Sequence, residues 1–173
     1  MPRDAVVRLG VRPLSGPLPL LAWRWDPETD ILSGSIAASA MSGDGPQATV
    51  ELTHADGGIA VLDVSGGAVA GLDIVVWPEV VTAPGLVPPR DTEDGRVVLQ
   101  SATRTGQVTS YELDLQLTIR TDPAERNWHM RIGEGEPVRR VRVAEGFILE
   151  LDDDGGLCGC WMLGVPPFPA LDD

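Results

Sequence analysis

Two histidines and two cysteines are the residues of this chain best suited to acid–base or nucleophilic chemistry. His129 lies in Trp128-His129-Met130, where a catalytic base would need a nucleophile and an orienting acid beside it. The sequence contains no Gly-x-Ser-x-Gly, no glycine-rich phosphate loop and no His-Glu-x-x-His motif. We therefore interpret His129 as a polar strand residue and predict a non-catalytic protein. An enzyme whose site assembles near His129 and Cys158 from distant residues is kept as an alternative.

The pair Cys158-Gly-Cys160 is the nearest match to a zinc motif. Residues two apart on a strand point to the same face, so both sulfurs would lie together. Structural zinc needs four ligands, and the other soft ligands, His54 and His129, are distant in the sequence. Free cysteines are often buried as small apolar side chains. The sequence therefore predicts two buried thiols rather than a zinc site or a disulfide framework.

An acidic turn near the C-terminal end resembles the start of a calcium loop. Glu150, Asp152 and Asp154 alternate and are followed by Gly155. A full loop carries a bidentate glutamate at its twelfth position, which here is Trp161, and it is flanked by helices where this sequence predicts strands. We interpret the segment as a solvated acidic turn and predict no metal and no cofactor.

Arginines and tryptophans are the candidates for binding a ligand or a partner. Almost half of the arginines fall between residues 120 and 142. Arginine suits planar carboxylate recognition, although pairing with neighbouring glutamates such as Glu136 is the simpler interpretation. Trp23 and Trp25 share one face of an expected strand and would form an interface if that face is exposed; most of the five tryptophans suit a core. The candidate binding residues are Trp23, Trp25, Trp128, His129, Arg140 and Arg142.

A hairpin that occurs twice organises these residues. Residues 147–152 alternate as a strand does, Asp153-Asp154-Gly155-Gly156 supplies turn residues, and residues 157–163 return as a second strand. We expect one face of this hairpin in a core and the other against a second layer or subunit. A similar hairpin spans residues 58–78, about 88 positions earlier. The aligned pairs are Gly58/Gly146, Val61/Leu149, Gly67/Gly155, Val69/Leu157, Gly71/Gly159, Ile74/Met162 and Pro78/Pro166.

A second anchor supports two related units. Residues 23–27 align with residues 119–123, and Ile36 aligns with Ile132, at a spacing of 96. The spacing then falls because the first copy is longer in the loop at 37–46, and insertions concentrate in loops. The other strands expected lie at residues 5–11, 20–25, 31–37, 49–53, 96–102, 110–120, 128–132 and 138–143.

Short strands with turn signals every eight to twelve residues are typical of an all-β sandwich or barrel. We predict two related antiparallel β-meander units that form a pseudo-twofold sandwich or barrel. The first β unit spans residues 1–81, a Pro/Gly-rich linker spans 82–95, and the second β unit spans 96–173. Each half alone would be marginally stable, so we expect the two units to share one core.

Motifs in both units resemble a known family. The first unit carries Trp25-Asp26-Pro27-Glu28-Thr29-Asp30-Ile31-Leu32, and the second carries Val-Ala-Glu-Gly-Phe-Ile-Leu-Glu at 143–150 with its acidic glycine turn. These motifs resemble the small bacterial family called domain of unknown function 2283, over residues 22–80 and 117–165. The resemblance implies a compact β fold, paired units and no catalytic residues, so that a tandem copy would look like a fused dimer. The chain departs from the pattern at Asn127-Trp128 and in the first hairpin, which lacks the acidic turn.

Composition limits the partners. The net charge of −13 argues against nucleic acid and anionic lipid, and no segment is long and apolar enough to span a membrane. The start of the chain lacks a secretory signal, and arginine replaces lysine throughout, so we expect a cytoplasmic protein of a GC-rich bacterium. Our leading hypothesis is a protein-interaction or assembly module, working as a homodimer or with a protein partner. The other alternative is a small-ligand binding protein with a pocket between the two units.

Overall fold

The computed structural model describes residues 7–41, 43, 45–100 and 108–169. Over these residues the protein is all-β, as predicted, with one short 3-10 helix, η1 (Ala38–Ala40), and no α-helix. No helix in this part of the chain has the length and apolarity to cross a membrane. The eight-stranded sheet contains β1 (Leu9–Arg12), β2 (Leu21–Trp25), β3 (Leu32–Ile36), β4 (Gln47–Thr53), β5 (Ile59–Ser65), β6 (Ala68–Val76), β9 (Arg96–Leu99) and β10 (Val108–Asp114). The seven-stranded sheet contains β7 (Val80–Thr82), β8 (Glu93–Asp94), β11 (Leu117–Thr121), β12 (Asn127–Ile132), β13 (Arg139–Ala144), β14 (Phe147–Leu151) and β15 (Leu157–Leu163).

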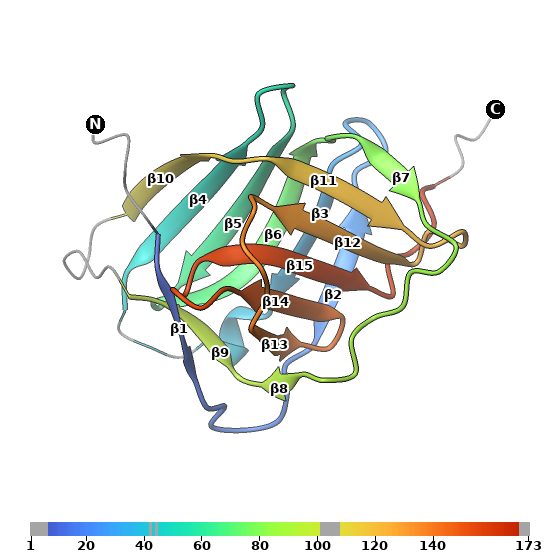
Figure 1. The fold of residues 1–173 in the computed structure, drawn as a ribbon. Coiled ribbons are helices and arrows are strands. Elements are labelled where there is room, and N and C mark those ends of the chain that lie inside the picture. The colour runs from blue at the N-terminus through green and yellow to red at the C-terminus, as the bar shows by residue number, and fades with distance from the viewer. Residues whose placement is uncertain (1–6, 42, 44, 101–107, 170–173) are drawn as a thin grey trace.

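The two sheets lie face to face, with the seven-stranded sheet in front in Figure 1. Because side chains alternate along a strand, each sheet turns one set of apolar residues toward the other. Leu62 of β5 and Leu149 of β14 belong to the same buried cluster, which draws residues from both sheets. Trp23 of β2 meets Phe147 of β14 edge-on, with ring centroids 5.5 Å apart. One hydrophobic core therefore joins the two sheets.

Both sheets contain five strands in the same spatial order. This order is β2-β3-β6-β5-β4 in the first sheet and β11-β12-β15-β14-β13 in the second, and every pairing within it is antiparallel. The predicted meander order is wrong, because the last strand of each unit inserts between two earlier strands instead of joining the edge: β6 lies between β3 and β5, and β15 lies between β12 and β14. The sheets are also mixed, since β10 pairs with β4, β7 with β11 and β8 with β13 in parallel.

The register of the two hairpins matches as well. Asp63 pairs with Gly71 in the first sheet and Glu150 pairs with Gly159 in the second, and a register shift follows directly after each pair. Leu62, immediately before Asp63, therefore occupies the place of Leu149. The sequence alignment that paired Val61 with Leu149 is out by one residue, because the shared turn glycines do not fix the bulges. Common descent of the two units, and their resemblance to the family named above, stay predictions.

The expected strand at 110–120 is in fact two strands. β10 ends at Asp114 in the first sheet and β11 begins at Leu117 in the second. Leu115 still donates its N–H to the carbonyl of Thr53, whereas Gly133 donates to the carbonyl of Gln116. The chain thus crosses between the sheets within two residues. Hydropathy alternation runs through this crossing, so it gave no signal. Parts of the expected strands at 5–11 and 96–102 lie outside the described residues.

The proline-rich segment at 82–95 does more than link the units. It is bounded by β7, which ends at Thr82, and contains β8. These two strands pair with opposite edge strands of the five-stranded set in the second sheet, β11 and β13. Between them the chain runs along the right-hand side of the sheet in Figure 1. Arg139 and Arg142 of β13 hold β8 through ion pairs to Glu93 and Asp94. The connection between β7 and β8, residues 83–92, is called the strap below.

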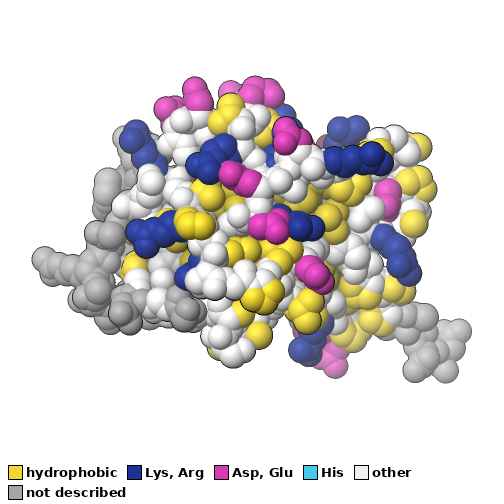
Figure 2. All heavy atoms as spheres, turned by 90° about the horizontal axis from the view of Figure 1, so that it is seen from below, with side chains coloured by type: hydrophobic (Ala, Val, Ile, Leu, Met, Phe, Trp, Pro, Cys, Tyr) yellow, Lys and Arg dark blue, Asp and Glu magenta, His cyan; other side chains and the backbone are white. Residues whose placement is uncertain are grey.

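Surface charge is mixed on the face seen from below Figure 1. Figure 2 shows acidic and basic side chains interspersed there among apolar ones. The net charge of −13 is therefore not gathered into one acidic field on this face. Such interspersed charges keep a surface soluble without marking it for one partner.

Candidate functional site

Polar residues gather on the outer face of the seven-stranded sheet, opposite the core. Pairing between β12 and β15 sets His129 beside Trp161 and Arg131 beside Gly159. Pairing between β14 and its neighbours then sets Glu150 between Gly159 and Arg140. The register thus lays Arg131, Gly159, Glu150 and Arg140 in one row across four strands. His129 lies in the next row, on the same face.

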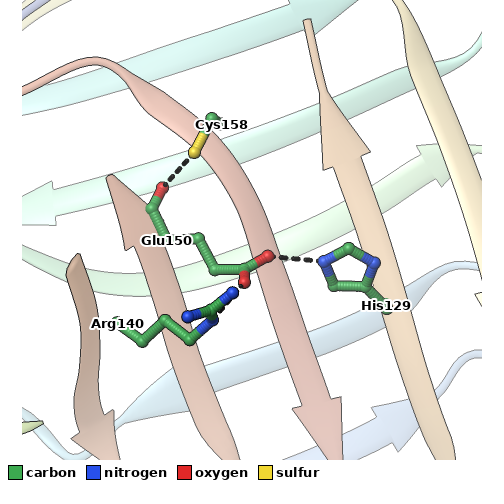
Figure 3. Close-up of polar contacts among 4 residues, drawn as sticks. All are labelled: His129, Arg140, Glu150 and Cys158. Atoms are coloured by element: carbon green, nitrogen blue, oxygen red, sulfur yellow. Dashed lines mark hydrogen bonds and ion pairs between the residues drawn. The ribbon is translucent and has the colours of Figure 1, made fainter. Parts of the chain in front are cut away.

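Glu150 is the centre of this arrangement (Figure 3). It is only 4 % exposed, and Glu150 and Thr121 are the two buried polar residues of the described chain. His129 Nε2 lies 2.5 Å from Glu150 Oε1, and Arg140 donates its Nε–H to Oε2 at 2.9 Å. A carboxylate can only accept, so His129 must hold its proton on Nε2. Each carboxylate oxygen of Glu150 therefore has a hydrogen-bond partner.

Opposing effects act on the Glu150 carboxyl. Burial alone would raise its pKa, because low dielectric disfavours the charged form. The hydrogen bond and charge of His129, followed by those of Arg140, outweigh burial and hold the pKa of Glu150 below its usual value. Glu150 is therefore an ionised carboxylate at neutral pH. It can orient His129, but it has no proton to give as a general acid.

Gly159 makes room for this carboxylate. A Cβ at this position would overlap Glu150 Oε1 and would lie 3.2 Å from both His129 Nε2 and the carbonyl of Met130. Glycine is needed here because the Glu150 side chain crosses directly over the strand to reach His129. The sequence shows Gly159 as a hairpin landmark, but the close approach that requires it is visible only in three dimensions.

Replacing Gly159 with alanine should destabilise the protein by about 2 kcal/mol, the usual scale for overpacking a tight site. The new methyl must push the carboxylate away from His129 or displace the β12 backbone. Urea unfolding measures the change. Gly85→Ala is the matched control, because its Cβ would meet nothing within 4 Å and its backbone is not left-handed. Equal effects of the two substitutions would contradict the close approach at Glu150.

The same face is hollowed into a cleft of about 420 Å³. Glu150, His129 and Trp161 lie in its lining, together with Arg120 and Arg131. Leu86 and Val87 of the strap line it as well, and so do Glu136 and Pro137 of the β12–β13 connection, which crosses the front of the sheet in Figure 1. The outer face of the hairpin therefore lies beneath other parts of the same chain, where we expected a second layer or a subunit.

The two cysteines point in different directions, contrary to the prediction that they share a face. Leu151 pairs with Leu157 and Glu150 with Gly159, so Cys158 is the extra residue of a bulge. Cys160 packs in the core, while Cys158 lines the cleft and donates its S–H to the backbone carbonyl of Glu150 at 3.4 Å. Burial, with the charges of Glu150 and Asp152, raises the pKa of Cys158 to about 11. Cys158 is therefore a protonated thiol and a poor nucleophile at neutral pH.

The tryptophans named as binding candidates lie elsewhere. Trp23 is 5 % exposed and donates its indole N–H to the carbonyl of Gly146 at 3.1 Å, so it joins the sheets instead of offering an interface. Trp128 is buried, and Trp25 is partly buried beside it, with ring centroids 6.2 Å apart. Trp77 stacks on Trp25 at 5.4 Å and Phe168 meets the same ring edge-on. These rings form an aromatic cluster at the edge of the core.

The two arginines of β13 named as candidates have different surroundings. Arg140 reaches the cleft and binds Glu150. Arg142 lies outside the cleft lining and forms two hydrogen bonds to Asp94, at 2.9 and 3.2 Å. Among the candidates, the structure brings His129 and Arg140 together on Glu150. Sequence reasoning treated Glu150 as part of an acidic turn. The available signal was a single glutamate within the apolar run 147–151.

A second hollow of about 460 Å³ lies where residues 14–20 pass the end of the sandwich. Ile36 and Val69 of the first sheet line it, as does Val143 of the second, so this hollow lies between the two units. Its lining is mainly apolar, and Arg96 is its one charged residue among those described. Arg96 already interacts with another group of the protein. This hollow thus lacks converging polar groups that could orient a ligand.

The equivalent face of the eight-stranded sheet has different chemistry. The shared register places Asp63 where the second sheet has Glu150, Ser33 where it has His129 and Thr49 where it has Arg140. No cationic side chain of the described residues forms an ion pair with Asp63; burial, and then the charge of Asp73, raise its pKa. The charged network is thus specific to the second sheet, although the backbone that carries it is present in both.

Replacing Asp73 with asparagine should stabilise the protein at pH 7 by about 0.5 kcal/mol, the scale of like charges on neighbouring strands. Asp63 has a raised pKa in the folded state, so its ionisation opposes folding above its ordinary pKa of 3.8. The gain should vanish below pH 3.8, where Asp63 is protonated in both variants. Thermal unfolding at pH 3 and 7 tests this, with the exposed turn substitution Asp153→Asn as control. A gain of equal size at both pH values would refute the charge explanation.

No protein-family model matches the chain, and no curated protein matches it.

Proposed function

We propose that this protein is a non-catalytic binding protein that holds a small ligand in the cleft on the outer face of the seven-stranded sheet. The observation that carries the proposal is the buried Glu150 carboxylate, held by His129 and Arg140 on the cleft floor. This site replaces the expected pocket between the units, because the hollow found there has few polar groups.

A purely structural role explains the network poorly. Burying a charge is costly, and apolar replacements of buried ion pairs are often as stable or more stable. The eight-stranded sheet has the same five-strand order without such a network. Functional sites are where buried charges with specific partners concentrate. The cleft volume also falls within the range of small-molecule sites.

The arrangement favours binding over catalysis. Glu150 is ionised and fully engaged, and Cys158 is a protonated thiol at neutral pH. No serine or threonine of the described chain lines the cleft. A histidine held by a carboxylate lacks a nucleophile to activate here, so the remaining role of the network is to fix donors in place for a ligand.

A fragment screen by NMR tests the proposal. The library should hold anionic, neutral and cationic fragments in comparable numbers. We expect hits to move the amide signals of His129 and Glu150 and the indole signal of Trp161, while the signals of Ser33 and Asp73 at the equivalent places of the first sheet stay still. A screen in which no fragment of any charge moves the cleft signals would remove the proposal.

The interaction hypothesis rests on a different observation. Exposed valines lie on β7, where Val80 is 40 % and Val81 is 50 % exposed, at the edge of the seven-stranded sheet. An edge strand with apolar side chains can pair with a strand of another chain. Native mass spectrometry of gently purified protein tests for a homodimer or a protein partner. A Val81→Lys substitution should dissociate such a complex if β7 forms the interface.

A further inference from the structure

We infer that the ligand of this cleft is a small organic carboxylate, and that Arg120 binds its charged group. This inference rests on the proposed function and names the chemical class of its ligand. Three features of the cleft carry it: an arginine that forms no ion pair with a described residue, a net positive charge in the lining, and an apolar wall contributed by the strap.

Of the three arginines that line the cleft, Arg120 is the one available to bind a ligand. Arg140 is committed to Glu150, and Arg131 forms an ion pair with Glu136 at 3.2 Å. Arg120 has no ion pair with any residue that the structure describes, and it is exposed. It lies on β11 directly across from His129 on β12. A guanidinium in this state presents two parallel N–H groups that match a carboxylate.

The charge balance of the lining favours an anionic ligand. Arg120, Arg131 and Arg140 carry three positive charges, against the two negative charges of Glu136 and Glu150. One positive charge therefore remains before any charge on His129 is counted, in a chain whose net charge is −13. A carboxylate neutralises this charge, whereas a cation would face Arg120 without compensation.

Organic rather than inorganic anions fit the remaining lining. Leu86, Val87 and Pro89 of the strap give the cleft an apolar side, and Val87 is 68 % exposed with nothing packed over most of its surface. The Trp161 ring lies against His129 with centroids 4.5 Å apart, and its indole N–H has no partner in the described part of the chain. A ligand with an apolar body could cover Val87 while its carboxylate lies at Arg120.

Titration with three probes tests the class of ligand. Benzoate, its neutral isostere benzamide and inorganic phosphate are added separately to the full chain, with the Trp161 indole signal and calorimetry as readouts. We expect benzoate to bind at least about tenfold more tightly than benzamide or phosphate, the scale of one charge-assisted hydrogen bond. Arg120→Gln should weaken benzoate about tenfold. Arg24→Gln is the matched control, because Arg24 is exposed at the equivalent place of the first sheet and should leave binding unchanged.

Each other outcome overturns the inference in a distinct way. Benzamide binding as tightly as benzoate would show that charge is not recognised, while leaving a ligand-binding cleft intact. Tighter binding of phosphate would replace the carboxylate by a phosphoryl group. Equal losses in Arg120→Gln and Arg24→Gln would place the bound anion outside the cleft. If no probe binds, the carboxylate class fails, and the fragment screen alone decides the proposed function.

Discussion

Phe147→Ala should destabilise the whole molecule by about 4 kcal/mol, the usual loss for removing a fully buried phenylalanine. Phe147 is completely buried on β14, and its ring meets Trp23 of the other sheet at 5.5 Å. The cavity would therefore open between the two sheets. Because one apolar cluster joins the sheets, we expect both to unfold in a single transition with an unchanged dependence on urea.

Urea unfolding followed by tryptophan fluorescence and by circular dichroism measures this effect. Phe168→Ala is the matched control: this ring is 40 % exposed and touches the edge of the aromatic cluster, so we expect a loss below about 1 kcal/mol. Two separated transitions in Phe147→Ala, one for each sheet, would show that the sheets are independent domains. Equal losses in the two variants would contradict the burial of Phe147.

The all-β class could be predicted because its signals are local. Alternation and turn glycines operate over a few residues, and they located the hairpins at 58–78 and 147–163 with little error. Strand order is not local. The insertion of β6 between β3 and β5, and of β15 between β12 and β14, depends on which apolar faces meet after the chain has closed. No pattern along the sequence distinguishes this order from a meander.

Part of the candidate site could be predicted from the sequence. His129 and Arg140 could be singled out as polar residues on expected strands, but Glu150 lies 21 and 10 residues away from them. Their meeting depends on β15 lying between β12 and β14 and on a glycine at 159. The opposite directions of Cys158 and Cys160 depend on a single bulge. Such features follow from cross-strand register, which a lone sequence does not specify.

The role of the strap in the cleft could not be predicted from the sequence either. Prolines and glycines at 82–95 correctly predict the lack of a continuous strand, and the natural interpretation is a linker. The structure gives this segment a second role, since Leu86 and Val87 form one side of the cleft. A connection becomes part of a site when its two ends are fixed at opposite edges of one sheet, as β7 and β8 are here.

Glu150→Gln should destabilise the protein by about 2 kcal/mol at pH 7, the scale of hydrogen bonds to a charged group. The range of about 3–5 kcal/mol for breaking a fully buried pair does not apply, because the Arg140 side chain is 32 % exposed and can turn toward water. The pKa of Glu150 is lowered in the folded state, so its contribution is complete above its ordinary pKa of 4.5 and is lost as the pH falls through the folded value. The difference between wild type and variant should therefore shrink below pH 4.5.

Unfolding of wild type and Glu150→Gln between pH 2 and 7 measures this, with the exposed Glu112→Gln as control, for which we expect no change. A loss that is independent of pH would exclude the charge as its cause. The combined apolar variant His129→Leu, Arg140→Met and Glu150→Leu separates stability from function. Since apolar replacement of a whole buried network is often neutral or stabilising, we expect the combined variant to unfold no more easily than the wild type. We expect it to bind benzoate more weakly, because the polar floor beside Arg120 is lost. That pair of results would mean that the network exists for its ligand and that the fold does not need it.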